Sequence, residues 1–341
     1  MQDIKLSICI ATFRRGAFIA QTLDSIISQI QPYVEIVVVD GASPDNTSEV
    51  LNPYVAKYPF ITYHRETENS GVDADYDKCV SYAKGEYCWL MPDDDLMLDG
   101  AIKAILDKCD DSNDLVIVNS SVRDNSLLTT YNSSLLTITA DKTYYAVTIN
   151  EFYSDCIRYL SFIGGVIVKR SFWLNRDRKT YYGSAFIHVG VLLQKPAPNK
   201  VSVIAQPFIA IRYGNAMWRP QTFNIWMHNW PKLIQSFTHL PNHVSSQITQ
   251  NSFLKTIKNL IIFRAQGYYG HKEYKEVTAT SSLISKLIKY IISITPIYLV
   301  NATLALGLLL FKPTSKMLIY DLASSRYSTK ISQFVAKKLG V

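Results

Sequence analysis

Three adjacent carboxylates are the strongest chemical signal in the sequence. Asp93, Asp94 and Asp95 directly follow the apolar segment 87–91 (YCWLM), which is typical of a buried strand. Such side chains repel one another unless a cation or hydrogen-bond donors compensate their charge. Hard divalent cations take oxygen ligands, and Mg²⁺ commonly shares a carboxylate with substrate phosphates. A solvated acidic turn that caps the next helix is the alternative, but the position at a strand end favours a site for Mg²⁺ or Mn²⁺.

Other polar residues also stand where apolar segments end. Thr12 closes the first such segment, and Arg14 follows it, where it could meet phosphates or lie in a solvated loop. Asp40 ends EIVVVD and could accept a hydrogen bond from a nucleobase N–H or cap the turn GASPDNT. In NSGVDADYDK we expect one or two carboxylates, Asp73 among them, to face the same site while the rest cap a helix.

Further candidates come later in the chain. His188 stands in the apolar stretch AFIHVGVLL, and it is either a base or metal contact or a core histidine. Gly164 and Gly165 interrupt the expected strand FIGGVIVK and would let another group approach its backbone. Trp218 and Arg219 could pack over a sugar and clamp a diphosphate.

The elements that must position these residues alternate between strand and helix. This order predicts a parallel α/β sheet over residues 1–120, in which ligands bind at the carboxyl ends of the strands. The residues Thr12, Asp40 and Asp93–Asp95 all fall at such ends. The expected strands are 5–12, 35–40, 60–65, 87–91, 115–119, 162–169 and 200–213, and the expected helices are 17–30, 48–58, 75–83, 99–109 and 185–193.

Charge is distributed unevenly along the 341 residues. Residues 251–341 hold 13 Lys and Arg against 3 acidic residues, a net charge of +10, whereas the rest of the chain carries −3. This basic segment includes 290–311, which has no charged residue and is long enough to cross a bilayer. Interfacial helices, a membrane span and helices packed on the domain all remain open. We expect a catalytic domain over 1–230 and a helical region over 231–341 that associates with an anionic membrane surface rather than with nucleic acid.

The five cysteines and the N-terminus bear on the compartment. Five is an odd number, and no C-x-x-C pair occurs, so neither a disulfide framework nor a zinc site is expected. The first residues, MQDIKLSICIATF, do not resemble a secretory signal, and a cytoplasmic location is the expectation.

Three separated motifs in order resemble the family 2 glycosyltransferases of the GT-A fold. They are SICIATFRRGAFIAQTLDSI, EIVVVDGASPDNT and NSGVDADYDKCVSYAKGEYCWLMPDDD, and the resemblance extends more loosely to about residue 230. Together with GNAMWRP, the longer stretches are most similar to the abequosyltransferase branch. The resemblance implies a Rossmann-like, mixed but mostly parallel sheet, a nucleotide-sugar donor and a divalent metal.

The resemblance, for Thr12, Arg14, Asp40 and Asp93–Asp95, and the residue types themselves, for the others, suggest the site roles. Thr12, Arg14, Asp40 and Asp73 would bind the nucleotide. Asp93 and Asp95 would hold the metal, with Asp94 and His188 closest to the chemistry, and Gly164, Gly165, Trp218 and Arg219 would shape the sugar and acceptor site.

Three departures from the family pattern stand out. Pro92 replaces the first Asp of the common D-x-D-D pattern, and Asp75-Tyr76-Asp77 replaces the frequent Ala-Arg-Asn. Around His188 the sequence is AFIH, where relatives carry the Glu-Asp pair that supplies the catalytic base. The identity of the base and the retaining or inverting course of the reaction therefore stay open.

The activity implied is transfer of a 3,6-dideoxyhexose such as abequose from a CDP-sugar. The implied acceptor is an undecaprenyl-diphosphate-linked oligosaccharide of O-antigen, at the cytoplasmic face of the bacterial inner membrane, with the protein bound there as a peripheral or monotopic protein. A relative that uses a UDP- or dTDP-sugar, a nucleotidyltransferase and a non-catalytic membrane adaptor are the alternatives.

Overall fold

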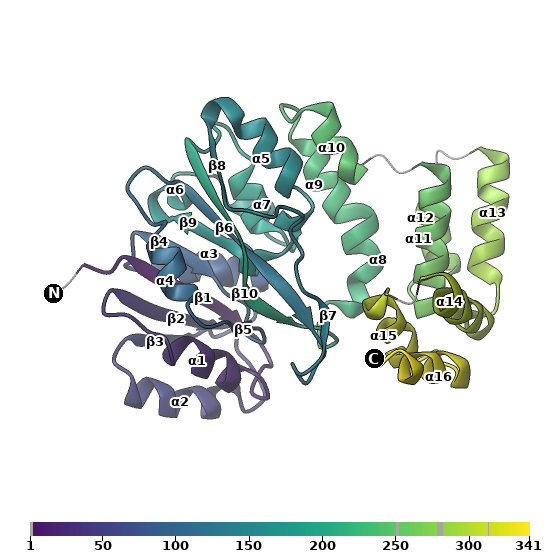
Figure 1. Ribbon diagram of the computed structural model, residues 1–341, viewed down its shortest axis with the longest axis horizontal. Coiled ribbons are helices and arrows are strands. Elements are labelled where there is room, and N and C mark those ends of the chain that lie inside the picture. Colours follow the sequence, from purple (N-terminus) through teal and green to yellow (C-terminus); the bar gives the residue numbers. More distant parts are fainter. Residues whose placement is uncertain (1–2, 250–251, 278–281, 313) are drawn as a thin grey trace. The chain divides into compact units, whose positions relative to one another are not determined.

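The computed structural model describes residues 3–249, 252–277, 282–312 and 314–341, which form two compact units (Figure 1). The first unit comprises the chain up to Arg123, Asn132–Arg212 and Leu233–Gln247, and the second comprises Asp124–Tyr131, Tyr213–Lys232 and the chain from Ile248 onward. The division differs from a single boundary at residue 230, because 213–232 group with the second unit and 233–247 with the first.

A mixed sheet forms the centre of the first unit. The strands of the chain are β1 (Leu6–Thr12), β2 (Val34–Asp40), β3 (Ile61–Arg65), β4 (Tyr87–Leu90), β5 (Leu96–Met97), β6 (Leu115–Arg123), β7 (Thr130–Asn132), β8 (Lys142–Tyr145), β9 (Val166–Lys169) and β10 (Lys200–Arg212). Their order is β3-β2-β1-β4-β9-β6-β10-β5. Strands β3, β2, β1 and β4 are parallel, β6 and β10 are parallel, and β9 runs antiparallel to both β4 and β6.

Helices occur in both units, and those of the first unit connect its strands. Along the chain they are α1 (Ile19–Ile27), α2 (Thr47–Lys57), α3 (Val72–Tyr82), α4 (Ala101–Leu106), α5 (Ile149–Cys156), α6 (Arg170–Leu174), α7 (Ile187–Leu192), α8 (Thr222–Asn224), α9 (Trp230–Ser236), α10 (Asn242–Thr249), α11 (Phe253–Gln266), α12 (His271–Val277), α13 (Leu283–Ile294), α14 (Ile297–Phe311), α15 (Lys316–Ser324) and α16 (Lys330–Lys338).

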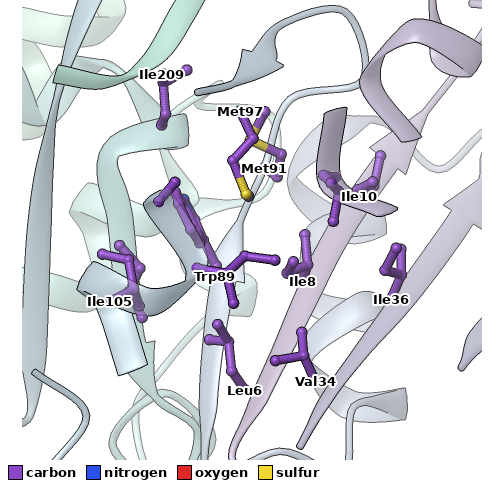
Figure 2. Packing of buried hydrophobic residues seen from close by; sticks show 14 of the residues in the cluster. Leu6, Ile8, Ile10, Val34, Ile36, Trp89, Met91, Met97, Ile105 and Ile209 are labelled. Atoms are coloured by element: carbon purple, nitrogen blue, oxygen red, sulfur yellow. The ribbon is translucent and has the colours of Figure 1, made fainter. Parts of the chain in front are cut away.

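The core of the first unit explains why these segments form strands. Every residue of β1 and of β2 is buried, as expected for parallel strands covered on both faces and rich in Val and Ile. Figure 2 shows Leu6, Ile8 and Ile10 of β1 beside Trp89 and neighbouring apolar side chains. Helix α1 buries one face, because its apolar residues recur at helical spacing.

The expected elements are confirmed to within a few residues through β6, and the mixed, mostly parallel sheet implied by the resemblance is confirmed. Pattern alone predicted a parallel sheet, which holds for the strands β3-β2-β1-β4. It did not predict that β9 would insert antiparallel between β4 and β6. Gly164 and Gly165 were expected on this strand, but they lie in the 3₁₀ turn that precedes it.

The second unit is helical in the C-terminal part of the chain. Asn301 of α14 is fully buried and donates hydrogen bonds to the carbonyl oxygens of Ala265 and Leu322, which ties α14 to α11 and α15. No single helix among the described residues has the length and apolar composition to cross a membrane. Helices α13 and α14 meet that test only as a pair, and they are bent by 98° with respect to each other.

Candidate active site at the carboxyl ends of the central strands

The acidic turn leaves the sheet directly after β4. Because β1, β2 and β4 are parallel neighbours, their carboxyl ends meet at one edge, where Thr12 pairs in register with Asp40. Met91 continues the β4 direction, with its N–H bonded to the carbonyl of Cys9, and Pro92–Asp95 follow. The sheet therefore brings the predicted nucleotide and metal residues to one edge.

Arg15 holds two of the three carboxylates. Its Nε lies 3.3 Å from Oδ1 of Asp93, and its Nη2 lies 3.1 Å from Oδ2 of Asp94. All three side chains are about nine-tenths buried, so this is a cluster of weakly hydrated charges. Burial raises the pKa of Asp93 to about 7, and the charge of Asp94 acts in the same direction while Arg15 opposes it.

Asp95 makes different contacts from Asp93 and Asp94, and the prediction that Asp93 and Asp95 hold the metal stays a prediction. Oδ1 of Asp95 accepts a hydrogen bond from the backbone N–H of Arg212 at 2.8 Å, and the Arg212 side chain donates to the carbonyl oxygen of Asp94. Thr22 of α1 donates its hydroxyl to the Asp95 carbonyl oxygen. Asp95 thus connects the turn to β10 and α1. Asp93 and Asp94 are the two carboxylates that contact the Arg15 guanidinium.

Asp40 is fully buried and already receives two hydrogen bonds. The backbone N–H of Ser43 donates to Oδ1 at 2.8 Å, and the hydroxyl of Tyr63 donates to Oδ2 at 2.8 Å. Arg14 is exposed beyond β1 and adopts a positive φ of 58°, and its backbone N–H donates to the Ser43 hydroxyl. Asp40 therefore shapes the loop that follows β2.

Helix α3 carries three buried carboxylates with different partners. Asp73 accepts hydrogen bonds from the backbone N–H groups of Ala185 and Ile187 at 2.9 and 3.0 Å and so holds the start of α7. Its role toward nucleotide stays a prediction. Asp77 accepts hydrogen bonds from Trp173 Nε1 and the Tyr182 hydroxyl and pairs with Arg178 Nε at 2.7 Å.

Asp75, between them, lies against Gly41. A Cβ atom at Gly41 would come within 2.6 Å of Asp75 Oδ2. Asp75 and Asp77 are among the carboxylates of NSGVDADYDK, of which one or two were expected to face the site. The available signal was the alternation of acidic residues with Ala74 and Tyr76 in a segment that turned out to be buried on both faces.

His188 lies inside the core, which argues against the predicted role as a base. It is 1% exposed, and its Nε2 is 2.8 Å from the carbonyl oxygen of Leu160. Because that oxygen only accepts, Nε2 carries the proton, and Nδ1 has no partner among the described residues. Burial lowers the pKa of His188 to about 4, so the ring is neutral near pH 7.

The two glycines support the acidic turn by their small size. A Cβ atom at Gly164 would approach Cδ of Pro92 to 2.8 Å, and the Gly164 carbonyl accepts a hydrogen bond from Trp89 Nε1. A Cβ atom at Gly165 would meet the ring of Tyr159 at 2.7 Å. Gly164 therefore lets the 3₁₀ turn pack closely against Phe162 and Pro92, and Gly165 lets it pack against Tyr159.

Trp218 and Arg219 belong to the second unit. Trp218 is 46% exposed, and its ring lies edge-on to Trp226 at a centroid distance of 6.1 Å. Arg219 Nη2 lies 3.7 Å from Oδ1 of Asp321. Their role toward sugar or acceptor stays a prediction.

The donor set fits a hard divalent cation in part. Within the described ranges, no group of three or more His, Cys, Asp or Glu side chains could hold a metal ion. Asp93 and Asp94 nevertheless direct carboxylate oxygens at one cationic group, and Mg²⁺ needs only one or two carboxylates when phosphates supply other ligands.

The fold is that of the GT-A glycosyltransferases. Residues 7–165 match the family model described as "Glycosyl transferase family 2", and this part of the chain is a family 2 glycosyltransferase domain. The chain is 28% identical over 199 residues to abequosyltransferase RfbV of Salmonella typhimurium, a match that covers 55% of the chain and 60% of that protein.

Two other relatives are informative. A poly(ribitol-phosphate) beta-glucosyltransferase of Bacillus spizizenii is 35% identical over 95 residues, covering 27% of the chain and 15% of that protein. The crystal structure of S. aureus TarS 1–349 in complex with UDP-GlcNAc superposes with a TM-score of 0.57 and 15% identity, covering 98% of this chain and 91% of that one. At this identity the structural likeness shows the fold alone. The chain spans less than two thirds of the length of both curated relatives.

Proposed function

We propose that the protein transfers a 3,6-dideoxyhexose such as abequose from a CDP-sugar to a lipid-linked O-antigen oligosaccharide. The observation that carries the proposal is the pair Asp93 and Asp94, converging on Arg15 at the strand edge that also bears Thr12 and Asp40. The likeness to an abequosyltransferase supports the sugar and the acceptor.

Asp93 and Asp94 would hold Mg²⁺ or Mn²⁺ together with the donor diphosphate. When bound, the metal neutralises charge that develops on the leaving diphosphate. Arg15 is the chain's own contribution beside it: its guanidinium is always charged and suits bidentate contact with phosphate oxygens. Asp95 and Gly164 keep the turn in place from behind.

The helical region supports the proposed membrane location. Large apolar side chains are strongly exposed on α13 and α14, among them Leu283 at 83%, Leu310 at 71% and Phe311 at 82%. This apolar surface occurs in the segment whose net charge is +10, a combination suited to an anionic bilayer surface. We therefore place the protein at the cytoplasmic face of the bacterial inner membrane, bound as a peripheral or monotopic protein that reaches an undecaprenyl-diphosphate-linked acceptor.

Calorimetric titration with CDP, UDP and dTDP, each with and without Mn²⁺, tests the donor. We expect binding of CDP that strengthens with metal and weakens in Asp94→Asn. Asp107→Asn is a matched control, since Asp107 is an exposed carboxylate paired with Lys103 on α4. A preference for UDP or dTDP would be consistent with a glycosyltransferase but would contradict the proposed CDP-sugar donor. Binding of no nucleotide would favour a non-catalytic adaptor.

Vesicle flotation tests the location. The full chain should float with vesicles that contain phosphatidylglycerol, and Leu283→Ser combined with Ile284→Ser should reduce the bound fraction. Val147→Ser is the matched control, because Val147 is 94% exposed but belongs to the first unit. Equal flotation of the double variant and the wild type would refute the role of α13.

A further inference from the structure

The carboxylate of Asp75 is placed beside the residue that follows Asp40. Asp75 is 2% exposed, and its Oδ2 lies 2.6 Å from the position that a Gly41 Cβ atom would take. Gly41 is the first residue after β2, at the edge where Thr12 and Asp40 end their strands. A side chain at position 41 would therefore require the Asp75 carboxylate to shift.

The two oxygens of Asp75 are not equivalent. Oδ1 accepts a hydrogen bond from the Ser70 hydroxyl at 2.9 Å and lies 3.9 Å from Lys78 Nζ. Among the described residues, no donor reaches Oδ2. Because the Asp75 side chain as a whole is 2% exposed, little water solvates its carboxylate, and Oδ2 is available as an acceptor for a ligand N–H group.

Two carboxylates, Glu66 and Asp40, and one cation, Lys78, act on Asp75, and Asp40 also lies 3.9 Å from Arg65 Nε. Burial raises the pKa of Asp75, and the charges of Glu66 and Asp40 act in the same direction, against Ser70 and Lys78. Lys78 itself is drawn more closely to Glu66, at 2.6 Å. A ligand group with N–H donors and partial positive charge is favoured at this position, and a carbonyl oxygen is repelled.

Asp40 does not by itself separate the pyrimidine bases. It is fully buried and occupied by Ser43 and Tyr63, and a single acceptor can pair with either base, since cytosine and uracil each present an N–H group. The bases differ at the exocyclic position, where cytosine has an amino group and uracil and thymine have a carbonyl oxygen. A carboxylate aimed at that position accepts from the first and repels the second.

We propose that Asp75 is the specificity-determining residue for the donor base, with Oδ2 accepting a hydrogen bond from the exocyclic amino group of cytosine above Gly41. This inference rests on the proposed use of a nucleotide-sugar donor and names how its base is selected.

The test is the ratio of the dissociation constants for UDP and CDP, measured by calorimetry with Mn²⁺ on the full chain. A well-placed polar pair is worth one to a few kcal/mol of discrimination, so the wild type should favour CDP by roughly tenfold or more. Asp75→Asn keeps the shape but adds an N–H₂ group that can donate to the uracil carbonyl, and the ratio should fall toward one.

Two further variants keep the result interpretable. Asp107→Asn removes an exposed carboxylate that pairs with Lys103 on α4, and it should retain the wild-type ratio. Gly41→Ala leaves the Asp75 carboxylate in the chain but displaces it, and it should lower the ratio as Asp75→Asn does.

The outcomes separate this inference from the proposed function. A folded Asp75→Asn variant with an unchanged ratio, or a wild type that prefers UDP, would overturn the inference and leave a glycosyltransferase with another means of base selection. Binding of no nucleoside diphosphate by the wild type would overturn both.

Discussion

His188 should control the acid stability of the protein and not the proton transfer of the reaction. The side chain is enclosed in the first unit, and burial lowers its pKa from the ordinary 6.5 to about 4. The unfolded chain therefore binds a proton at a higher pH than the folded chain does. The stabilisation from neutral His188 is complete above the unfolded pKa and is lost as the pH falls from about 6.5 toward 4.

The size of the effect follows from that difference in pKa. Each unit corresponds to about 1.4 kcal/mol, so the full difference is worth about 3 kcal/mol. Between about pH 7.5 and pH 5, His188 should lower the free energy of unfolding by about 2 kcal/mol. The reason is that at pH 5 the ring is mostly protonated in the unfolded chain but still almost wholly neutral in the folded chain.

His188→Gln is the informative substitution. The amide of glutamine can still donate to the carbonyl oxygen of Leu160, but it does not titrate. We expect urea unfolding, followed by tryptophan fluorescence, to show a pH-dependent loss of stability that is about 2 kcal/mol smaller in the variant than in the wild type. His64→Gln is the control in the same unit, since His64 stacks on Tyr82 at the surface side of β3.

The turnover of the His188→Gln variant distinguishes a structural role of His188 from a catalytic one. If His188 accepted the proton of the acceptor hydroxyl, His188→Gln would abolish turnover at every pH while leaving the acid limb of unfolding unchanged. That pair of results would refute the assignment of His188 to the core.

Three further substitutions test the support of the site. Gly164→Val should destabilise the protein by about 1–3 kcal/mol in urea unfolding, because its side chain would meet Pro92, and a stability equal to the wild type would contradict the close packing. Asp77→Asn should lower the midpoint of thermal unfolding, because it removes the charge that faces Arg178 and takes hydrogen bonds from Trp173 and Tyr182; calorimetry would reveal an unchanged midpoint if the cluster contributes nothing. Asp94→Asn should raise the Mn²⁺ concentration needed for half-maximal CDP binding by roughly tenfold, whereas an unchanged requirement would remove Asp94 from the metal site.

The central strands could be predicted because their signal is local. An unbroken run such as SICIAT or EIVVVD can only be accommodated inside a covered sheet, and the polar residues that end such runs must then meet at one edge. The position of the acidic turn followed from the same reasoning. The direction of β9 could not be predicted from its own residues, because an apolar strand packs equally well either way and its pairing with β4 and β6 depends on distant segments.

The ion-pair and hydrogen-bond partners of individual charged side chains could not be predicted from the sequence either. Arg14 and Arg15 are adjacent and chemically identical, yet Arg14 is exposed and Arg15 pairs with the acidic turn. The backbone makes the difference: Arg14 takes a positive φ, which sends the two side chains in different directions. Asp73 was likewise predicted to bind nucleotide, but the donors that reach its carboxylate are backbone N–H groups more than a hundred residues away.

Helix α3 also bears on how such an enzyme could change its donor. Asp73 and Asp77 are four residues apart and therefore lie on one face, where they hold the segment that leads into α7. Asp75 projects from the other side of the helix, toward Gly41. Substitutions on the side of α3 that faces Gly41 can therefore occur without weakening the contacts of Asp73 and Asp77 with the segment before α7. In evolution or in protein engineering, nucleotide preference could change at this helix while the rest of the fold stays the same.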